Sequence, residues 1–186
     1  MDFAAWFERG LTYEAFLSRY ADEEQRRRWS VLHSQVTLTV GQKELLRGFR
    51  RLMKVLVVAG TWCGDCVNQC PILARFAAEN ELLQIRFFDR DVSADLAREL
   101  SICGAPRVPS VLFLSEDNFA CGRYGDRTLS KYRQVAAEGF GPACPTGIVP
   151  PAREILDSVI QDWLNEFERI QLMLLTSGRL RTLHGD

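Results

Sequence analysis

The stretch KVLVVAGTWCGDCVNQCP, residues 54–71, decides how the rest of the chain is interpreted. It opens with a short, β-branched apolar run that ends at Gly60, which is typical of a strand buried on both faces. Cys63 and Cys66 follow, and a helix is predicted from about residue 64 to residue 80. The cysteine pair therefore lies between a buried strand and the start of a helix.

That position favours thiol chemistry. The unsatisfied N–H groups and the dipole of a helix N-terminus favour negative charge, so we expect them to lower the pKa of Cys63 from about 8.5 to about 7. Cys66 lies one turn further on, close enough to form a disulfide with Cys63. Because the thiolate is the attacking species, the spacing predicts Cys63 as the nucleophile and Cys66 as the resolving thiol. Asp65, expected to point outward from the helix start, opposes thiolate formation by like-charge repulsion.

Length and composition indicate a soluble globular protein. The 186 residues suit one domain, or one domain with appended helices. The 23 basic and 24 acidic residues balance, so we expect neither nucleic acid nor a membrane as a partner. No stretch reaches the roughly 18 apolar residues of a membrane span, and the first residues do not resemble a secretory signal. We expect a cytoplasmic protein, in which a close cysteine pair is more often catalytic or metal-binding than structural.

The order of the predicted elements indicates an α/β fold. The first 50 residues contain helices with N-cap candidates at Thr12, Asp22 and Thr39. Residues 35–41 suit either a strand or a linker. After the cysteine helix come a strand at 82–89, a helix at 93–101 capped by Ser93, strands at 110–115 and 118–124, and a helix at 128–138. This order predicts parallel strands first and an antiparallel hairpin last, in an α/β sandwich.

Three segments are expected along the chain. Residues 1–53 form a helical extension packed on the core, residues 54–138 form the core, and residues 139–186 form a glycine- and proline-rich loop and a C-terminal helix. That helix, at 153–175, carries an apolar face that must dock on another surface. The tail after Gly178 is expected to be loose. The terminal helices are expected to cover the core or to mediate homodimer formation.

Two sequence motifs resemble the thioredoxin superfamily: WCGDC at 62–66 followed by Pro71, and RVPS at 107–110. WCGDC and the helical N-terminal extension further resemble a bacterial group of thioredoxin-like proteins. The resemblance covers about residues 54–138. It implies a thioredoxin-like three-layer α/β/α sandwich with a mixed sheet and added terminal helices.

The resemblance also implies roles for individual residues. Trp62 matches the tryptophan before the nucleophile, and Pro71 matches the proline that kinks the active-site helix. Pro109 matches the cis proline that faces the disulfide and leaves neighbouring backbone available to an extended substrate. Gly125 matches a glycine near the substrate groove. The residues expected to support the active site are Trp62, Gly64, Asp65, Val108 and Pro109.

Two positions depart from the thioredoxin pattern. Val57 stands where thioredoxins keep a buried acid six residues before the nucleophile. Phe87 is the nearest match to the lysine that commonly partners this acid. We therefore expect the acid–base relay for the resolving cysteine to be absent, with Asp65 as an alternative acid. A narrower or slower role than that of housekeeping thioredoxins fits better.

The other cysteines leave several hypotheses open. Cys70 lies four residues after Cys66 on the same helix face, which extends the motif to C-x-x-C-x-x-x-C. A zinc site needs four ligands, and neither a second CxxC nor a paired histidine spacing supplies the fourth, so no metal is predicted. Cys70 and Cys103 are candidate accessory thiols. A second redox disulfide is an alternative among Cys103, Cys121 and Cys144.

The predicted function is that of a thiol–disulfide oxidoreductase that reduces protein disulfides through Cys63 and Cys66. The expected partners are a disulfide-containing protein or a small thiol substrate, with a reductase or a low-molecular-weight thiol as electron donor. No cofactor is implied. The alternatives are a thioredoxin-fold binding or adaptor module with regulatory thiols, and a protein that binds a metal ion or cluster.

Overall fold

A four-stranded mixed sheet forms the centre of the computed structural model, which describes residues 1–139 and 151–186. The strands are β1 (Met53–Ala59), β2 (Leu83–Asp89), β3 (Ser110–Leu114) and β4 (Ala120–Gly125), in the order β2-β1-β3-β4. β1 is parallel to β2 and antiparallel to β3, and β3 and β4 form an antiparallel hairpin. The predicted order of parallel strands followed by a hairpin is confirmed.

The two central strands are covered on both faces. Every residue of β3 is buried, as is every residue of β1 except Lys54. Their apolar runs therefore lack the alternation of a half-exposed strand. At the β2 edge, Leu11 forms an isolated antiparallel bridge with Phe87, so the N-terminal segment covers part of this edge.

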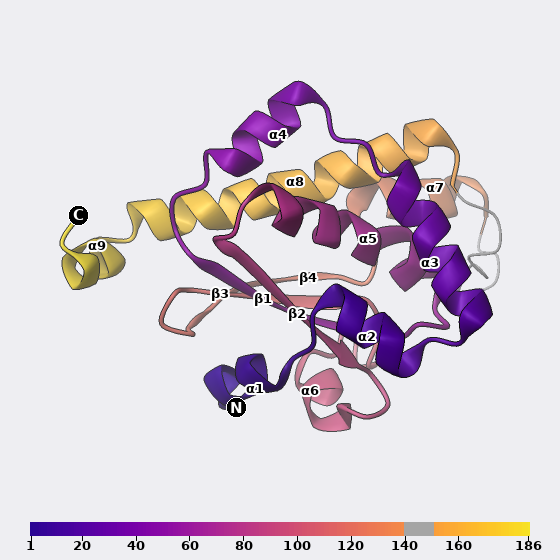
Figure 1. Cartoon of the computed structure of the whole chain (residues 1–186), viewed down its shortest axis with the longest axis horizontal. Helices are drawn as coiled ribbons and strands as arrows, with labels where there is room; N and C mark the ends of the chain where they lie inside the picture. The colour runs from indigo at the N-terminus through magenta and orange to yellow at the C-terminus, as the bar shows by residue number, and fades with distance from the viewer. Residues whose placement is uncertain (140–150) are drawn as a thin grey trace.

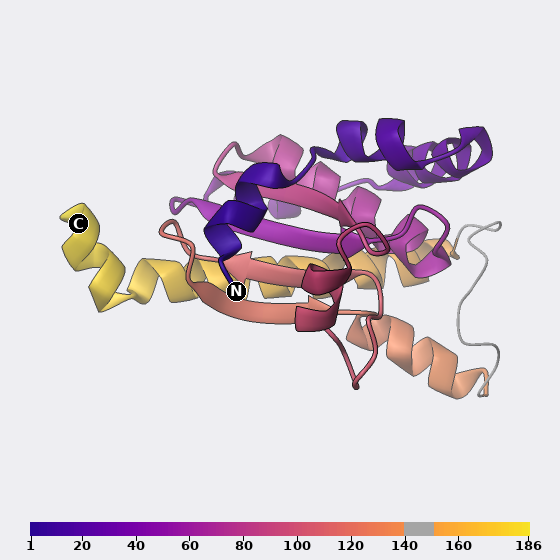
Figure 2. The ribbon, with the colours of Figure 1, turned by 90° about the horizontal axis from the view of Figure 1, so that it is seen from below.

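Helices on both faces of the sheet give three layers. Figure 1 shows α5 (Gly64–Glu79) and α8 (Arg153–Thr176) on one face, with α1 (Phe3–Arg9) and α6 (Ala94–Glu99) on the other. Figure 2 views the sheet from the side of α1 and α6, with α8 behind it. Phe167 of α8 packs edge-on against Phe76 of α5 and Phe113 of β3, with ring centres 5.3 and 5.1 Å away. The thioredoxin-like α/β/α sandwich with added terminal helices is confirmed.

The N-terminal helices begin at the predicted caps. Thr12, Asp22 and Thr39 each accept a hydrogen bond from the backbone N–H three residues later. They start α2 (Tyr13–Tyr20), α3 (Glu23–Gln35) and α4 (Val40–Arg47). Residues 36–39 connect α3 to α4 without forming a strand, which agrees with the linker interpretation.

The N-terminal extension shares its hydrophobic core with the sheet. Phe16, Trp29 and Leu32 belong to the same buried cluster as the residues of β1 and β3. The indole N–H of Trp29 donates a hydrogen bond of 3.0 Å to the carbonyl oxygen of Thr61, two residues before Cys63. The extension therefore supports the segment that leads from β1 to the cysteine pair.

Two local expectations were wrong. α6 begins after Ser93, but the Ser93 side chain makes no capping hydrogen bond. The tail is not loose, because residues 178–184 form the helix α9 (Gly178–His184). Leu180 of α9 is buried, which anchors this helix to the rest of the chain.

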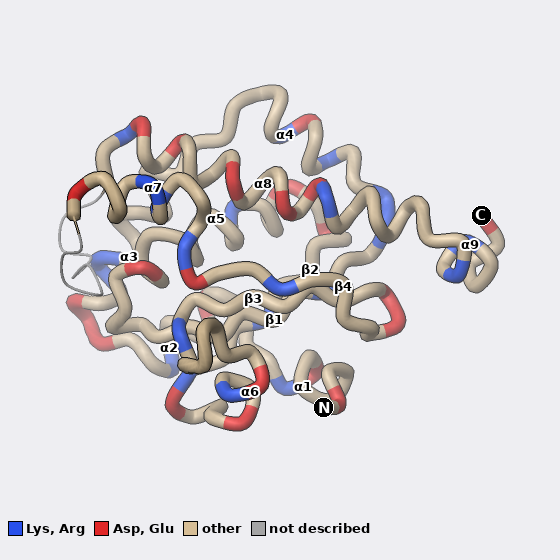
Figure 3. The backbone as a smooth tube through the Cα atoms, turned by 180° about the vertical axis from the view of Figure 1, so that it is seen from behind, with Lys and Arg blue, Asp and Glu red and all other residues tan. Residues whose placement is uncertain are grey.

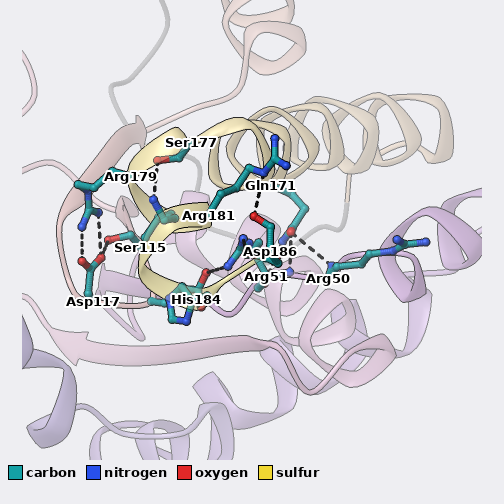
Figure 4. A network of polar contacts seen from close by, with 12 residues as sticks. Arg50, Arg51, Ser115, Asp117, Gln171, Ser177, Arg179, Arg181, His184 and Asp186 are labelled. Carbon is teal, nitrogen blue, oxygen red and sulfur yellow. Dashed lines mark hydrogen bonds and ion pairs between the residues drawn. The ribbon is translucent and has the colours of Figure 1, made fainter.

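A polar network holds α9 in place (Figure 4). The buried Arg51 side chain forms ion pairs with Glu116, at 3.0 Å, and with Asp186. His184 lies 3.1 Å from Glu116, and Arg179 pairs with Asp117. These contacts join the C-terminus to the turn between β3 and β4, so packing orders the tail despite its polar sequence.

Charged residues of both signs are mixed along the chain, and the described helices are too short or too polar to span a membrane. Basic and acidic residues are interspersed along the backbone in Figure 3. Within residues 1–139 and 151–186, no helix is both long and apolar enough to span a bilayer.

Cys144 and residues 140–150 of the glycine- and proline-rich stretch lie outside the described residues.

Candidate functional site

Cys63 and Cys66 lie together where β1 leads into α5. Cys63 is the N-cap residue of α5, with φ −82° and ψ 124°, and Cys66 lies in the first turn. The two side chains are in hydrogen-bond contact. The Cys66 sulfur also accepts a hydrogen bond from the backbone N–H of Gly60, at 3.4 Å. The structure thus brings the two predicted thiols together at the helix start.

The loop that contains Pro109 faces Cys63. The Val108–Pro109 peptide bond is cis, as predicted, and the Cys63 thiol donates a hydrogen bond of 3.6 Å to the Val108 carbonyl oxygen. Gly125 lies against the same loop with φ +125°, and a Cβ atom there would lie 2.3 Å from the Pro109 carbonyl oxygen. Only glycine suits both this conformation and this close approach.

Trp62 and Gly64 flank the nucleophile. Trp62 is 42% exposed, and the Arg90 guanidinium lies 4.5 Å from its ring centre. Gly64 is buried as the first residue of α5. Cys63 therefore lies between an exposed aromatic surface and the loop of Pro109.

The Cys63 thiol is less acidic than the sequence predicted, and Cys66 shares the same direction of pKa shift. The neighbouring Cys66 sulfur, burial and the Asp65 carboxylate raise the pKa of the Cys63 thiol. Burial raises the pKa of Cys66, which is completely buried. Dehydration and the second sulfur disfavour a thiolate more than the helix N-terminus favours it. Because the two thiols interact, their protons leave in two steps that belong to the pair.

Asp65 is buried, which contradicts the expected outward orientation. Only 3% of the residue is exposed, and Arg127 holds its Oδ2 atom through Nε at 3.0 Å and Nη2 at 2.9 Å. Burial raises the pKa of Asp65, and the Arg127 guanidinium opposes that rise. No local signal in the sequence points to Arg127, because it lies 62 residues from Asp65 along the chain.

An apolar pair occupies the positions of the expected acid and its lysine partner. Val57 and Phe87 are both buried and lie opposite each other in the parallel register of β1 and β2. Neither side chain can accept or donate a proton. Proton transfer to or from Cys66 therefore cannot pass through these two positions.

The remaining thiols differ in their surroundings. Cys70 is completely buried and its side chain contacts that of Cys66. Cys103 is exposed, with φ +51°, in the segment before Pro109, and Cys121 is half-buried on β4. In the described part of the chain no two cysteines form a disulfide, and no cluster of His, Cys, Asp or Glu is placed to hold a metal ion. Cys144 lies outside this part, so the second-disulfide hypothesis stays a prediction.

Comparisons with known proteins agree with this fold. A family model described as Thioredoxin matches residues 10–136. The structure is similar to that of PA1234, a protein of unknown function from Pseudomonas aeruginosa, with 20% identity and a TM-score of 0.72 over 90% of this chain and 98% of that one. It is also similar to an HIV epitope-scaffold protein, with 18% identity and a TM-score of 0.63 over 100% of this chain and 99% of that one. No curated protein gives a significant sequence match.

Proposed function

This chain belongs to the thioredoxin family, and we propose that it is a thiol–disulfide oxidoreductase that reduces disulfide-containing substrates. The observation that carries the proposal is the contact between Cys63 and Cys66 opposite the cis Val108–Pro109 bond. A thiol pair in this position supplies a nucleophile and a resolving group. The backbone beside Pro109 offers hydrogen-bonding groups to an extended substrate segment.

The reaction proceeds by two thiol–disulfide exchanges. Cys63, as the thiolate, attacks one sulfur of the substrate disulfide, forms a mixed disulfide, and releases the other substrate sulfur as a thiolate that takes up a proton. Cys66 then loses its proton and attacks the Cys63 sulfur. The bond between Cys63 and the substrate breaks, the second substrate thiol leaves, and a Cys63–Cys66 disulfide remains. The substrate gains two electrons, which a reductase or a low-molecular-weight thiol later restores to the protein.

The electrostatics support a slow or selective enzyme. Raised thiol pKa values leave little thiolate at neutral pH, and the thiolate is the reactive species. The apolar Val57–Phe87 pair does not help Cys66 to lose its proton. A substrate that binds well beside Trp62 and Pro109 would compensate by holding its disulfide close to Cys63.

Trapping experiments test the proposal. Cys63→Ser is expected to abolish reduction of a protein disulfide, because it removes the nucleophile. Cys66→Ser is expected to accumulate a mixed disulfide at Cys63 that dithiothreitol releases. Cys121→Ser, which changes a thiol on β4, serves as the matched control and should retain activity. Full disulfide reduction by Cys63→Ser would contradict the proposal.

A binding or adaptor module is the second candidate, favoured by the apolar pair at Val57 and Phe87. In that case the thiols would regulate binding of a partner rather than turn over substrates. The same variants separate the two functions. An adaptor would show no catalytic disulfide reduction even with every cysteine present, and Cys63→Ser would abolish the response of partner binding to oxidation.

A further inference from the structure

The Asp65 carboxylate is held on one side only. Both contacts from Arg127 reach Oδ2, at 3.0 and 2.9 Å. Across the described residues, Oδ1 of the same carboxylate has no hydrogen-bond partner, although it is buried. The large majority of buried side-chain polar atoms in native structures have a hydrogen-bond partner, so we expect a donor at this oxygen.

A small cavity adjoins Asp65 between the start of α5 and the start of α8. Its volume is about 10 Å³, close to the least space that a water molecule needs. One wall is polar and comes from α5 and α7 (Leu129–Ala137), and the other is apolar and comes from α8 and Pro151. The lining residues are Asp65, Asn68, Gln69, Lys131, Pro151, Ile155, Leu156 and Val159.

The polar groups of the cavity wall differ in whether they already have hydrogen-bond partners. Asn68 Oδ1 is a second buried acceptor for which the described chain supplies no donor. Gln69 is already satisfied, since it donates to the Asp126 carbonyl oxygen at 2.8 Å and accepts from the Trp163 indole at 3.1 Å. Lys131 donates to Gln134 at 2.8 Å. Two acceptors on cavity-lining residues of α5 are therefore open to a ligand that donates two hydrogen bonds.

We propose that this cavity binds one water molecule, which donates one hydrogen bond to Asp65 Oδ1 and the other to Asn68 Oδ1. Water fits the volume, supplies two donors, and is neutral, so it can lie beside Lys131 and Arg127 without repulsion. A metal cation is disfavoured because these two positive side chains lie nearby and only two ligand oxygens are offered.

The water would favour the ionised form of Asp65. Burial raises the pKa of Asp65 and Asp126 adds to the rise, whereas Arg127 and Lys131 oppose it. A hydrogen bond donated to Oδ1 favours the ionised form further. The Asp65 carboxylate in turn raises the pKa of Cys63, to which Cys66 also contributes. Asp65 is therefore a positioning residue, which acts on the reaction only through Cys63. That effect on catalysis rests on the proposed function, whereas the water site does not depend on it.

A high-resolution crystal structure of the reduced protein tests the site directly. Electron density for a water within hydrogen-bonding distance of both Asp65 Oδ1 and Asn68 Oδ1 is the expected result. A dry cavity, or one filled by another part of the chain, would overturn the proposal.

Solution measurements on variants provide a second test. Asn68→Leu removes one acceptor and fills the space, and Val159→Leu fills the same cavity from α8 while leaving Asn68 in place. Each variant is expected to raise the pKa of Asp65, so that its acid dissociation constant falls by about tenfold. Carboxyl ¹³C NMR follows this titration. Asn165→Leu, on the exposed face of α8, is the matched control and should leave it unchanged.

The two variants also report on the nucleophile. Alkylation of Cys63 at pH 7 should become faster in Asn68→Leu and Val159→Leu, because a larger neutral fraction of Asp65 opposes the Cys63 thiolate less. Unchanged Asp65 titration in both variants would refute the water site. None of these measurements requires disulfide reduction, so failure of the proposed function would be recognised separately.

Discussion

Replacing Arg127 by methionine is expected to destabilise the protein strongly at pH 7 and only weakly near pH 4. The Arg127 and Asp65 side chains are 10% and 5% exposed, so the substitution leaves a buried carboxylate without its counterion. Removal of one partner of a buried ion pair costs about 3–5 kcal/mol. For a chain of this length, a loss of 3 kcal/mol corresponds to a fall in melting temperature of about 6–12 °C.

The pH dependence follows from the direction of the Asp65 shift. In Arg127→Met, the folded-state pKa of Asp65 rises further above its unfolded value of about 3.9. The folded protein then binds more protons than the unfolded chain between these two pKa values, so the free energy of unfolding falls as pH rises through that window. Below the unfolded pKa Asp65 is neutral in both states, and the missing counterion no longer matters.

Urea unfolding followed by circular dichroism at pH 4, 5, 6 and 7 measures this effect. The matched control is the double variant Asp65→Asn/Arg127→Met, which has no buried charge to compensate and should recover most of the loss at pH 7. An equal loss at pH 4 and pH 7 would refute the electrostatic explanation. So would a double variant as unstable as Arg127→Met.

Two further predictions concern the thiol site. The rate of Cys63 alkylation by iodoacetamide, mapped by mass spectrometry, should keep rising beyond pH 8.5, because the Cys66 sulfur, burial and Asp65 raise the pKa of Cys63; a plateau reached near pH 7 would contradict this. Gly125→Ala is expected to lower the free energy of unfolding, measured with urea, by about 2–4 kcal/mol and to slow disulfide reduction, because its Cβ would lie 2.3 Å from the Pro109 carbonyl oxygen. An unchanged urea midpoint would contradict this prediction, because it would mean that the Pro109 loop accommodates the added Cβ atom without loss of stability.

Local signals in the sequence were sufficient for most of the secondary structure. Thr12, Asp22 and Thr39 act on N–H groups three residues away, so their capping role can be recognised without tertiary information. The apolar runs of β1 and β3 identify buried strands because burial on both faces removes polar residues from such strands. The division of the chain into three segments stays a prediction, although the N-terminal helices share the core of the sheet.

Part of the site could also be predicted from sequence. Cys63 and Cys66 meet because residues three apart at a helix start lie on one side of the first turn. The cis bond before Pro109 was expected from the resemblance to thioredoxins, and it is present. These features depend on a few consecutive residues whose backbone geometry is nearly the same wherever the motif occurs.

Long-range packing decided the rest. Asp65 is held in a buried position by Arg127, 62 residues away in the segment after β4, and the tail is tied to the rest of the chain by the pair between Arg51 and Asp186, 135 residues apart. Most of the elements, their order and the thiol pair could be predicted from the sequence alone, since these follow from short-range patterns of polarity and hydrogen bonding. The acidity of the thiols could not be predicted in this way, because dehydration and neighbouring charge depend on which distant side chains surround the sulfur atoms in the folded chain.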